Sequence, residues 1–232
     1  MNKIAVISDV HGNYPALQAV LSDIDKRGIN TVYCLGDLVG YYCMINEVID
    51  EIRNREIPSI MGNHDFAMVE NSGKIPTSIT CTRILQRQLG SISAGNFDYL
   101  KGLKLSLSFQ HKNVGYYCVH GGLKNNVEEY IREIDENYFV SNNFDKDVLI
   151  SGHTHLPVIK RFLHNVYLNP GSVGQPRDGD NRASYMIILD GNDFELVRVS
   201  YDIDAIVSQM KQEKYEPYVY EGLYLGRGVG SF

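Results

Sequence analysis

Residues 3–26 read KIAVISDVHGNYPALQAVLSDIDK, and this stretch decides the fold class of the chain. Residues 3–8 are a short run rich in β-branched side chains, which predicts a buried strand. Pro15 then begins a stretch, ending at residue 26, whose apolar residues recur at helical spacing. The loop between them carries Asp9 and His11. The sequence therefore opens with a strand, a polar loop and a helix.

The same order continues through the first sixty residues. Residues 31–35 predict a second strand, residues 45–53 a second helix and residues 57–61 a third strand, which gives the order βαβαβ. Such alternation favours a parallel sheet with right-handed crossovers. The second half is richer in strands, expected at residues 105–109, 114–119, 148–151, 158–162, 166–168, 183–189 and 194–200, and residues 203–211 predict a last helix. Together these patterns predict an α/β (α+β) fold.

The composition is that of an ordinary globular protein. We expect one domain over residues 1–232, because 44% of the residues are hydrophobic and 22% are charged. The 22 basic and 28 acidic residues leave a net charge of −6, which argues against extended nucleic-acid binding. Since no apolar run is long enough to cross a membrane, we expect a cytoplasmic protein without membrane association.

The four cysteines are scattered, and none forms a C-x-x-C pair. This pattern gives no indication of a zinc or redox motif, so we expect reduced thiols. Cys34 and Cys118 lie inside predicted strands, where a cysteine acts as a small apolar core residue.

Polar residues gather where the predicted strands end. Five of the seven histidines directly follow a predicted strand, and the same loops carry two aspartates and an asparagine. Ligands collect at the carboxyl ends of strands in open α/β sheets. Any single histidine is more often an ordinary loop or core residue, but the whole set favours a functional site.

Carboxylates and imidazoles together are the ligands of Mn²⁺, Fe²⁺, Zn²⁺, Co²⁺ and Ni²⁺. Seven residues qualify, too many for one catalytic ion that keeps open positions, whereas two ions that share a carboxylate use them all. We therefore predict a site for two divalent ions, with Mn²⁺ as the first expectation. The candidate ligands are Asp9, His11, Asp37, Asn63, His120, His153 and His155.

The polar motifs occur in the order D-x-H, G-D-x-x-G, G-N-H-D, H-G and G-H-x-H. In this order they resemble the calcineurin-like metallophosphoesterase superfamily, and the resemblance spans residues 3 to about 190. It implies a two-sheet β-sandwich flanked by helices, with a metal pair at one sheet edge. It also implies that one ion is held by Asp9, His11, Asp37 and His155 and the other by Asp37, Asn63, His120 and His153.

Departures from the motifs of other branches narrow the resemblance. Gly40 stands where purple acid phosphatases have an iron-binding tyrosine, and the Asp-Arg-Gly of protein serine/threonine phosphatases is replaced by Gly40-Tyr41-Tyr42. The chain is similar instead to small single-domain phosphodiesterases of bacteria and archaea, which share a segment like NPGSVGQPR at residues 169–177. This similarity implies hydrolysis of a small phosphodiester, nucleotides included.

The expected mechanism is attack by a hydroxide that bridges the two ions. His64 is the candidate acid that protonates the leaving group, and Asp65 the candidate that orients its ring. Asn63 and Arg177 are candidate substrate contacts, although Arg177 also fits a solvated turn. Residues 72–102 are expected to be helical, either as a cap that selects the leaving group or as ordinary surface helices.

Three other functions fit the same motifs. A phosphomonoesterase or a dinucleoside polyphosphate hydrolase would use the same metal pair, with the substrate chosen by the surrounding loops. A protein-binding scaffold without catalysis is the alternative of another class, exemplified by the retromer subunit of similar fold. Because that subunit has lost the catalytic histidine and this chain keeps His64, the sequence favours an enzyme. The oligomeric state and the role of the Tyr- and Gly-rich tail after residue 215 stay open.

Overall fold

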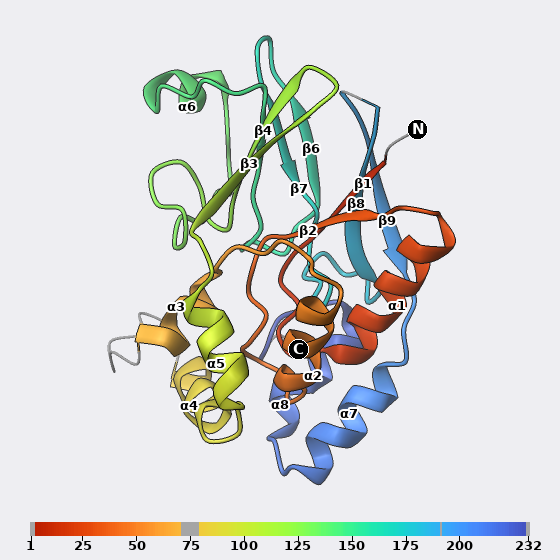
Figure 1. The fold of residues 1–232 in the computed structure, drawn as a ribbon. Helices are drawn as coiled ribbons and strands as arrows, with labels where there is room; N and C mark the ends of the chain where they lie inside the picture. Colours follow the sequence, from red (N-terminus) through yellow and green to blue (C-terminus); the bar gives the residue numbers. More distant parts are fainter. Residues whose placement is uncertain (1–2, 71–78, 191, 231–232) are drawn as a thin grey trace.

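The computed structural model describes residues 3–70, 79–190 and 192–230. It consists of two sheets packed against each other and flanked by helices (Figure 1). The first sheet has the strand order β2-β1-β8-β9, formed by Thr31–Cys34, Ile4–Ile7, Ala183–Asp190 and Asp193–Val199. Strand β1 pairs in parallel with β2 and antiparallel with β8. The first sheet is therefore mixed, and not parallel as the βαβαβ pattern predicted.

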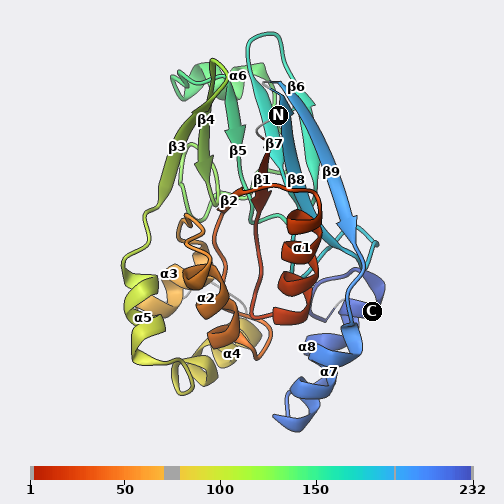
Figure 2. The ribbon, with the colours of Figure 1, turned by 45° about the vertical axis from the view of Figure 1, so that its right-hand side comes forward.

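The second sheet has the strand order β3-β4-β5-β7-β6. Its strands are Ser106–His111, Val114–Val119, Val148–Ile150, Val166–Asn169 and Val158–Arg161. The three central strands run in parallel, and the two outer strands are antiparallel to their neighbours. The predicted two-sheet architecture flanked by helices is thus confirmed, and Figure 2 shows the two sheets together above the helical layer.

Most of the helices lie below the sheets in Figures 1 and 2. Helix α1 follows the predicted pattern, since Leu17, Val20 and Ile24 are buried against the first sheet. Its first turn is capped by the side chain of Asn13, which accepts a hydrogen bond from the N–H of Ala16. The helices are α1 (Tyr14–Lys26), α2 (Ile45–Asn54), α3 (Asn63–Glu70), α4 (Ile79–Leu89), α5 (Ala94–Lys101), α6 (Glu136–Ser141), α7 (Ile203–Gln212) and α8 (Pro217–Tyr220), with a 3₁₀ turn at Glu221–Leu225.

The predicted third strand at residues 57–61 is wrong. The segment forms only two isolated parallel bridges, from Ser59 to Cys34 and from Ile60 to Lys104. Ser59 pairs with the last residue of β2, whereas Ile60 pairs with Lys104, which precedes the first strand of the second sheet. The segment therefore forms no continuous ladder with either neighbour. Ile57 and Ile60 are nevertheless buried, which explains why the apolar pattern looked like a strand.

Strand β1 is buried on both faces. Ala5 and Ile7 belong to the core under α1, whereas Ile4 and Val6 belong to the core between the two sheets. Alternate residues of a strand point to opposite faces, so two layers of cover require a continuous apolar run. The chain can turn polar only after Ile7, where the strand leaves both cores, and the candidate site begins there.

Among the described helices, none has the length and apolar character needed to cross a membrane.

Candidate metal centre

The loops that carry the candidate ligands have an unusual backbone conformation. Asp9 and Asp37 have φ angles of 55° and 54°, in the left-handed region that residues with a side chain seldom adopt. His11, His153 and His155 lie in the same region, with φ angles of 52°, 66° and 61°. Each such residue costs of order 1–3 kcal/mol, and strain of this kind gathers at functional sites. Five of the seven predicted ligands therefore stand on strained backbone.

Asp65 holds the loop that presents Asp37. Its buried carboxylate accepts hydrogen bonds from the N–H groups of Asp37 at 2.8 Å, Leu38 at 2.9 Å, Val39 at 3.1 Å and Gly62 at 2.9 Å. Both oxygens are thus directed at backbone. The expectation that Asp65 orients the ring of His64 does not agree with these contacts, and the geometry instead makes Asp65 a support of the ligand loops.

Gly62 allows the two loops to approach each other closely. A Cβ at this position would lie 2.1 Å from Oδ1 of Asp37, far inside contact distance. The same oxygen of Asp37 accepts a hydrogen bond of 2.8 Å from the N–H of His64. The glycine before Asn63 therefore serves the close approach that the sequence motif indicated.

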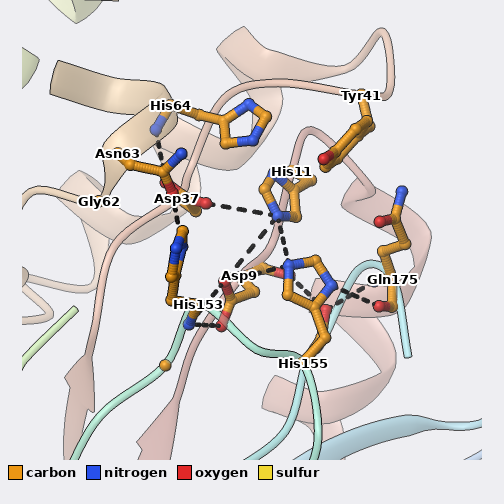
Figure 3. Close-up of polar contacts among 12 residues, drawn as sticks. Asp9, His11, Asp37, Tyr41, Gly62, Asn63, His64, His153, His155 and Gln175 are labelled. Carbon is orange, nitrogen blue, oxygen red and sulfur yellow. Dashed lines mark hydrogen bonds and ion pairs between the residues drawn. The ribbon is translucent and has the colours of Figure 1, made fainter. Parts of the chain in front are cut away.

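The first group of candidate ligands comprises Asp9, His11, Asp37 and His155. One donor atom from each lies within 4.8 Å of the donors of the other three, and all four residues are buried (Figure 3). The Nε2 atom of His155 lies 3.1 Å from Nε2 of His11 and 3.3 Å from Oδ1 of Asp9. The Nε2 atom of His11 is 3.5 Å from Oδ2 of Asp37.

The tautomers of His11 and His155 follow from their other ring nitrogens. Nδ1 of His11 donates to the carbonyl oxygen of Val39 at 3.0 Å, and Nδ1 of His155 donates to that of Gln175 at 2.6 Å. In neutral rings this leaves an unshared electron pair on each Nε2. Both electron pairs face the same small space, so a cation between them satisfies both. The donor set thus fits a divalent metal ion of the imidazole-binding kind.

The second group surrounds Asn63. Nε2 of His120 lies 3.0 Å from Oδ1 of Asn63 and 3.4 Å from Oδ2 of Asp37, while Nδ1 of His153 lies 2.9 Å from the same Asn63 oxygen. Nδ1 of His120 donates to the carbonyl oxygen of Leu35 at 2.8 Å, which again directs Nε2 toward the cluster. Asp37 stands between the two groups. The structure thus brings all seven predicted ligands together.

The electrostatics of this cluster demand positive charge. Burial by itself would lower the pKa of His120, but the carboxylate of Asp37 raises it to about 10. Burial would likewise raise the pKa of Asp37, and the neighbouring His120 holds it well below its usual value. In the absence of a cation, the two buried carboxylates favour the protonated form of the nearest imidazole. A metal ion satisfies the same demand and leaves the imidazole neutral.

His64 lies beside the first group without joining it. Its ring stands edge-on to that of His11 at 4.7 Å and packs against Tyr41 at 4.8 Å, measured between ring centroids. The sulfur of Cys81 is 3.4 Å from its Nδ1. Burial lowers the pKa of His64 to about 4, so the buried ring is neutral at pH 7.

Sequence reasoning missed three residues that hold the site. Gln175 supplies the carbonyl for His155 and, through its side chain, hydrogen bonds to Tyr42 and Arg177. The side chain of Gln88 holds the loop after Asp37, and Tyr130 packs its ring 5.1 Å from that of His153. Only Gln88 gave a signal in the sequence, as a glutamine on the apolar face of an amphipathic helix. The contacts of Gln175 and Tyr130 depend on how the loops fold.

The helical segment predicted at residues 72–102 is described from residue 79 onward, and residues 71–78 lie outside the described residues. Helices α4 and α5 place Leu85 and Leu100 in the main core. Helix α4 also brings Cys81 to His64. The described part is therefore an integral element of the fold that contacts the site from one side, and its role in selecting the leaving group stays a prediction.

A two-sheet fold with a buried cluster of carboxylates and imidazoles beyond its strand ends fits a metal-dependent hydrolase. Comparisons with known proteins agree. Residues 2–193 match the sequence profile of the calcineurin-like phosphoesterase superfamily domain. The uncharacterized protein MJ0912 of Methanocaldococcus jannaschii is 36% identical over 244 residues, which cover 97% of this chain and 98% of that protein. The chain belongs to the calcineurin-like phosphoesterase superfamily.

Further relatives are consistent with this membership. The phosphodiesterase YfcE of Escherichia coli K12 is 27% identical over 196 residues, which cover 80% of this chain and 86% of that protein. A metallophosphoesterase from Sphaerobacter thermophilus superposes with a TM-score of 0.83 at 30% identity, covering 97% of this chain and 99% of that one. The hypothetical protein PH1004 from Pyrococcus horikoshii OT3 has a TM-score of 0.89 at 22% identity, with 98% and 100% covered, which shows the common fold.

Proposed function

We propose that this protein hydrolyses small phosphodiesters with two divalent metal ions, of which Mn²⁺ is the first choice. The observation that carries the proposal is the 3.1 Å approach of the two Nε2 atoms of His11 and His155, each with its Nδ1 directed at a backbone carbonyl. Two electron pairs that face each other beside a carboxylate repel one another, and a cation bound between them removes this repulsion. The relatives named a phosphodiesterase and a metallophosphoesterase supply the reaction class.

The first ion would be held by Asp9, His11, Asp37 and His155, and the second by Asp37, Asn63, His120 and His153. Bound ions of this kind lower the pKa of water toward about 7 and hold phosphoryl oxygens. Asp37 would be shared, which agrees with its place between the two groups. Asp65, with its four backbone hydrogen bonds, keeps Asp37 at that place.

His64 and Arg177 would act on the substrate. His64 in its protonated form would give a proton to the leaving oxygen as the ester bond breaks and return to the neutral ring, and a bound anionic phosphate favours that protonated form. The guanidinium of Arg177 would hold a phosphate oxygen of the substrate, since the described groups to which it donates hydrogen bonds, Gln175 and Tyr41, are both neutral.

The test is hydrolysis of bis(p-nitrophenyl) phosphate by protein stripped of metal and then supplied with Mn²⁺. We expect activity only with added metal, loss of activity with chelator, and two Mn²⁺ per chain by metal analysis. Asp37→Asn is expected to lose both ions. His164→Ala, at an exposed histidine outside the ligand motifs, is the matched control and keeps both.

Contrary results would be clear. Hydrolysis that survives complete removal of metal would exclude the proposed chemistry. Full metal content in Asp37→Asn would exclude a shared carboxylate at this position. Turnover of p-nitrophenyl phosphate much faster than of the diester would instead assign the site to phosphomonoesters.

A further inference from the structure

A cavity of about 660 Å³ opens beside the metal centre. Tyr41, which lines it, packs its ring 4.6 Å from that of His11, and Tyr130, on another part of its wall, packs its ring 5.1 Å from that of His153. Two tyrosines of the cavity wall therefore contact one histidine from each group of candidate ligands. Its volume is within the usual range for small-molecule sites and exceeds what a single phosphoryl group occupies.

The charge of the cavity is opposite to that of the protein. The described residues that line it include two arginines, Arg177 and Arg227, and no carboxylate, although the whole chain carries a net charge of −6. Arg177 is partly buried, and its described hydrogen-bond partners, Gln175 and Tyr41, are neutral. A guanidinium whose hydrogen-bond partners are all neutral can still bind an anion through its planar N–H donors.

The second arginine comes from the C-terminal tail. Arg227 is exposed, and no described carboxylate forms an ion pair with it. The tail backbone lies directly against the first arginine, because a Cβ on Gly228 would be 3.2 Å from Nε of Arg177. Both arginines thus line the same cavity, although fifty residues of sequence separate them.

The tail is a fixed part of this wall. The N–H of Gly179 donates to the carbonyl oxygen of Gly226 at 3.0 Å, and the side chain of Asn181 donates to that of Tyr224 at 3.1 Å. Val219 and Leu223 are buried in a separate apolar cluster with α7. This region follows residue 193, where the match to the family profile ends. The part of the cavity wall formed by Tyr218 and residues 227–230 therefore lies beyond the profile match, whereas Tyr41, Tyr130 and Arg177 lie within it.

We propose that this cavity is a subsite for a second phosphate group of the substrate, held by Arg177 and Arg227. Arginine pairs with phosphate oxygens through its planar fork of N–H donors. The tyrosines of the wall, Tyr41, Tyr130 and Tyr218, would cover the organic part that joins the second phosphate to the scissile one. This inference rests on the proposed function, and it names the class of ester that the enzyme prefers.

The kinetic test compares two chromogenic diesters that differ by one group. One is thymidine 5′-(p-nitrophenyl phosphate), and the other is the same compound with an added 3′-phosphate. We expect the Mn²⁺-loaded enzyme to have the higher kcat/KM for the second compound. Arg227→Met should reduce the ratio of the two kcat/KM values about tenfold or more, because a hydrogen-bonded ion contact is lost. Arg161→Met, at an exposed arginine on β6, should leave the ratio as it is.

A binding measurement separates this inference from the proposed function. Inorganic pyrophosphate is titrated calorimetrically into metal-depleted full-length protein, whose fold is first checked by circular dichroism. We expect Arg227→Met and Arg177→Met to raise the Kd about ten- to a hundredfold relative to Arg161→Met. Equal Kd values for the three variants, or no binding to the unmodified protein at millimolar pyrophosphate, would overturn the subsite. If neither diester is hydrolysed but the binding difference holds, the proposed function fails and the subsite stands.

Discussion

The side chain of Gln88 in α4 is hydrogen bonded to both backbone groups of Gly40. Its Oε1 accepts from the N–H of Gly40 at 2.9 Å, and its Nε2 donates to the carbonyl oxygens of Gly40 at 3.1 Å and Tyr42 at 2.7 Å. Gly40 has a φ of 93° and ends the loop that begins with Asp37. A buried glutamine on a helix thus ties the helical layer to the ligand loop.

Replacement of this glutamine by an apolar residue should loosen the loop. Gln88→Leu removes the glutamine partner of three backbone groups. The carbonyl of Gly40 keeps the N–H of Tyr42 as a donor, and each group left unsatisfied costs about 1–3 kcal/mol. We expect a lower free energy of unfolding in urea and weaker Mn²⁺ binding by calorimetry. Gln86→Leu, at an exposed position of the same helix, is the matched control. Unchanged stability and metal affinity in Gln88→Leu would show that the loop keeps its conformation without the hydrogen bonds of Gln88.

Asp65 should prove to be a structural support of the site. In Asp65→Asn one acceptor oxygen replaces two, so at least one of the four N–H groups loses its partner at a cost of about 1–3 kcal/mol. We expect a lower urea midpoint together with reduced Mn²⁺ affinity. Asp135→Asn is the matched control. Asparagine caps a helix as well as aspartate does, so this change at the N-cap of α6 should alter neither quantity. A variant that binds metal normally and loses only kcat would restore the direct catalytic role that the sequence motif indicated.

How far the sequence predicts this molecule depends on the range of the contacts. The helix at residues 15–26 was predicted because its own spacing carries the signal, and β1 because its burial on both faces leaves a continuous apolar run. The antiparallel pairing of β8 with β1 joins residues about 180 positions apart, and no local pattern encodes it. The strand predicted at residues 57–61 failed for the same reason, since its apolar residues bridge two sheets instead of extending one.

The ligand set was predictable because its chemistry is local to each motif. Each predicted ligand directly follows a strand or opens a helix, and the parallel strands bring those ends to one edge. The partners of these residues were not predictable. Asp65 was assigned to His64 from sequence proximity, but a helical turn directs its carboxylate at the loop of Asp37. The wall formed by Arg177 and Gly228 joins segments that no motif connects.

Gly62 should tolerate no side chain. The added Cβ of Gly62→Ala would stand 2.1 Å from Oδ1 and 2.3 Å from the backbone nitrogen of Asp37, so the ligand loop must move. We expect loss of metal binding and of activity. Gly95→Ala provides the contrast, because its Cβ meets only the end of the Arg53 side chain at 3.6 Å and the residue lies within α5. That variant should gain about 0.5–1 kcal/mol in unfolding free energy and keep its metal. Metal binding by Gly62→Ala at the unmodified affinity would contradict the close approach of the two loops.

Bound metal should stabilise the fold measurably. The cluster joins loops after β1, β2, β4 and β5, so ions that bind only the folded chain shift the unfolding equilibrium by mass action. At free Mn²⁺ one hundred times the Kd, this amounts to about 2.7 kcal/mol per site. We expect a rise of the melting temperature with Mn²⁺, reversal by chelator, and loss of the rise in Asp37→Asn but not in His164→Ala. A melting temperature that does not change when millimolar Mn²⁺ is added would mean that the cluster is not a metal site.

His64 should matter for turnover and not for metal binding. Its ring packs against His11 and Tyr41 and is not one of the clustered ligands, so His64→Ala is expected to retain Mn²⁺. Loss of a general acid lowers kcat by about 10²–10⁴-fold, and the loss should be largest for esters whose leaving group needs a proton. Comparison of bis(p-nitrophenyl) phosphate with an alkyl diester separates this role from packing, since p-nitrophenolate departs without protonation and a packing defect would slow both alike. An equal reduction for the two esters would assign His64 to the structure of the site, and retained turnover of the alkyl diester would remove it from the reaction.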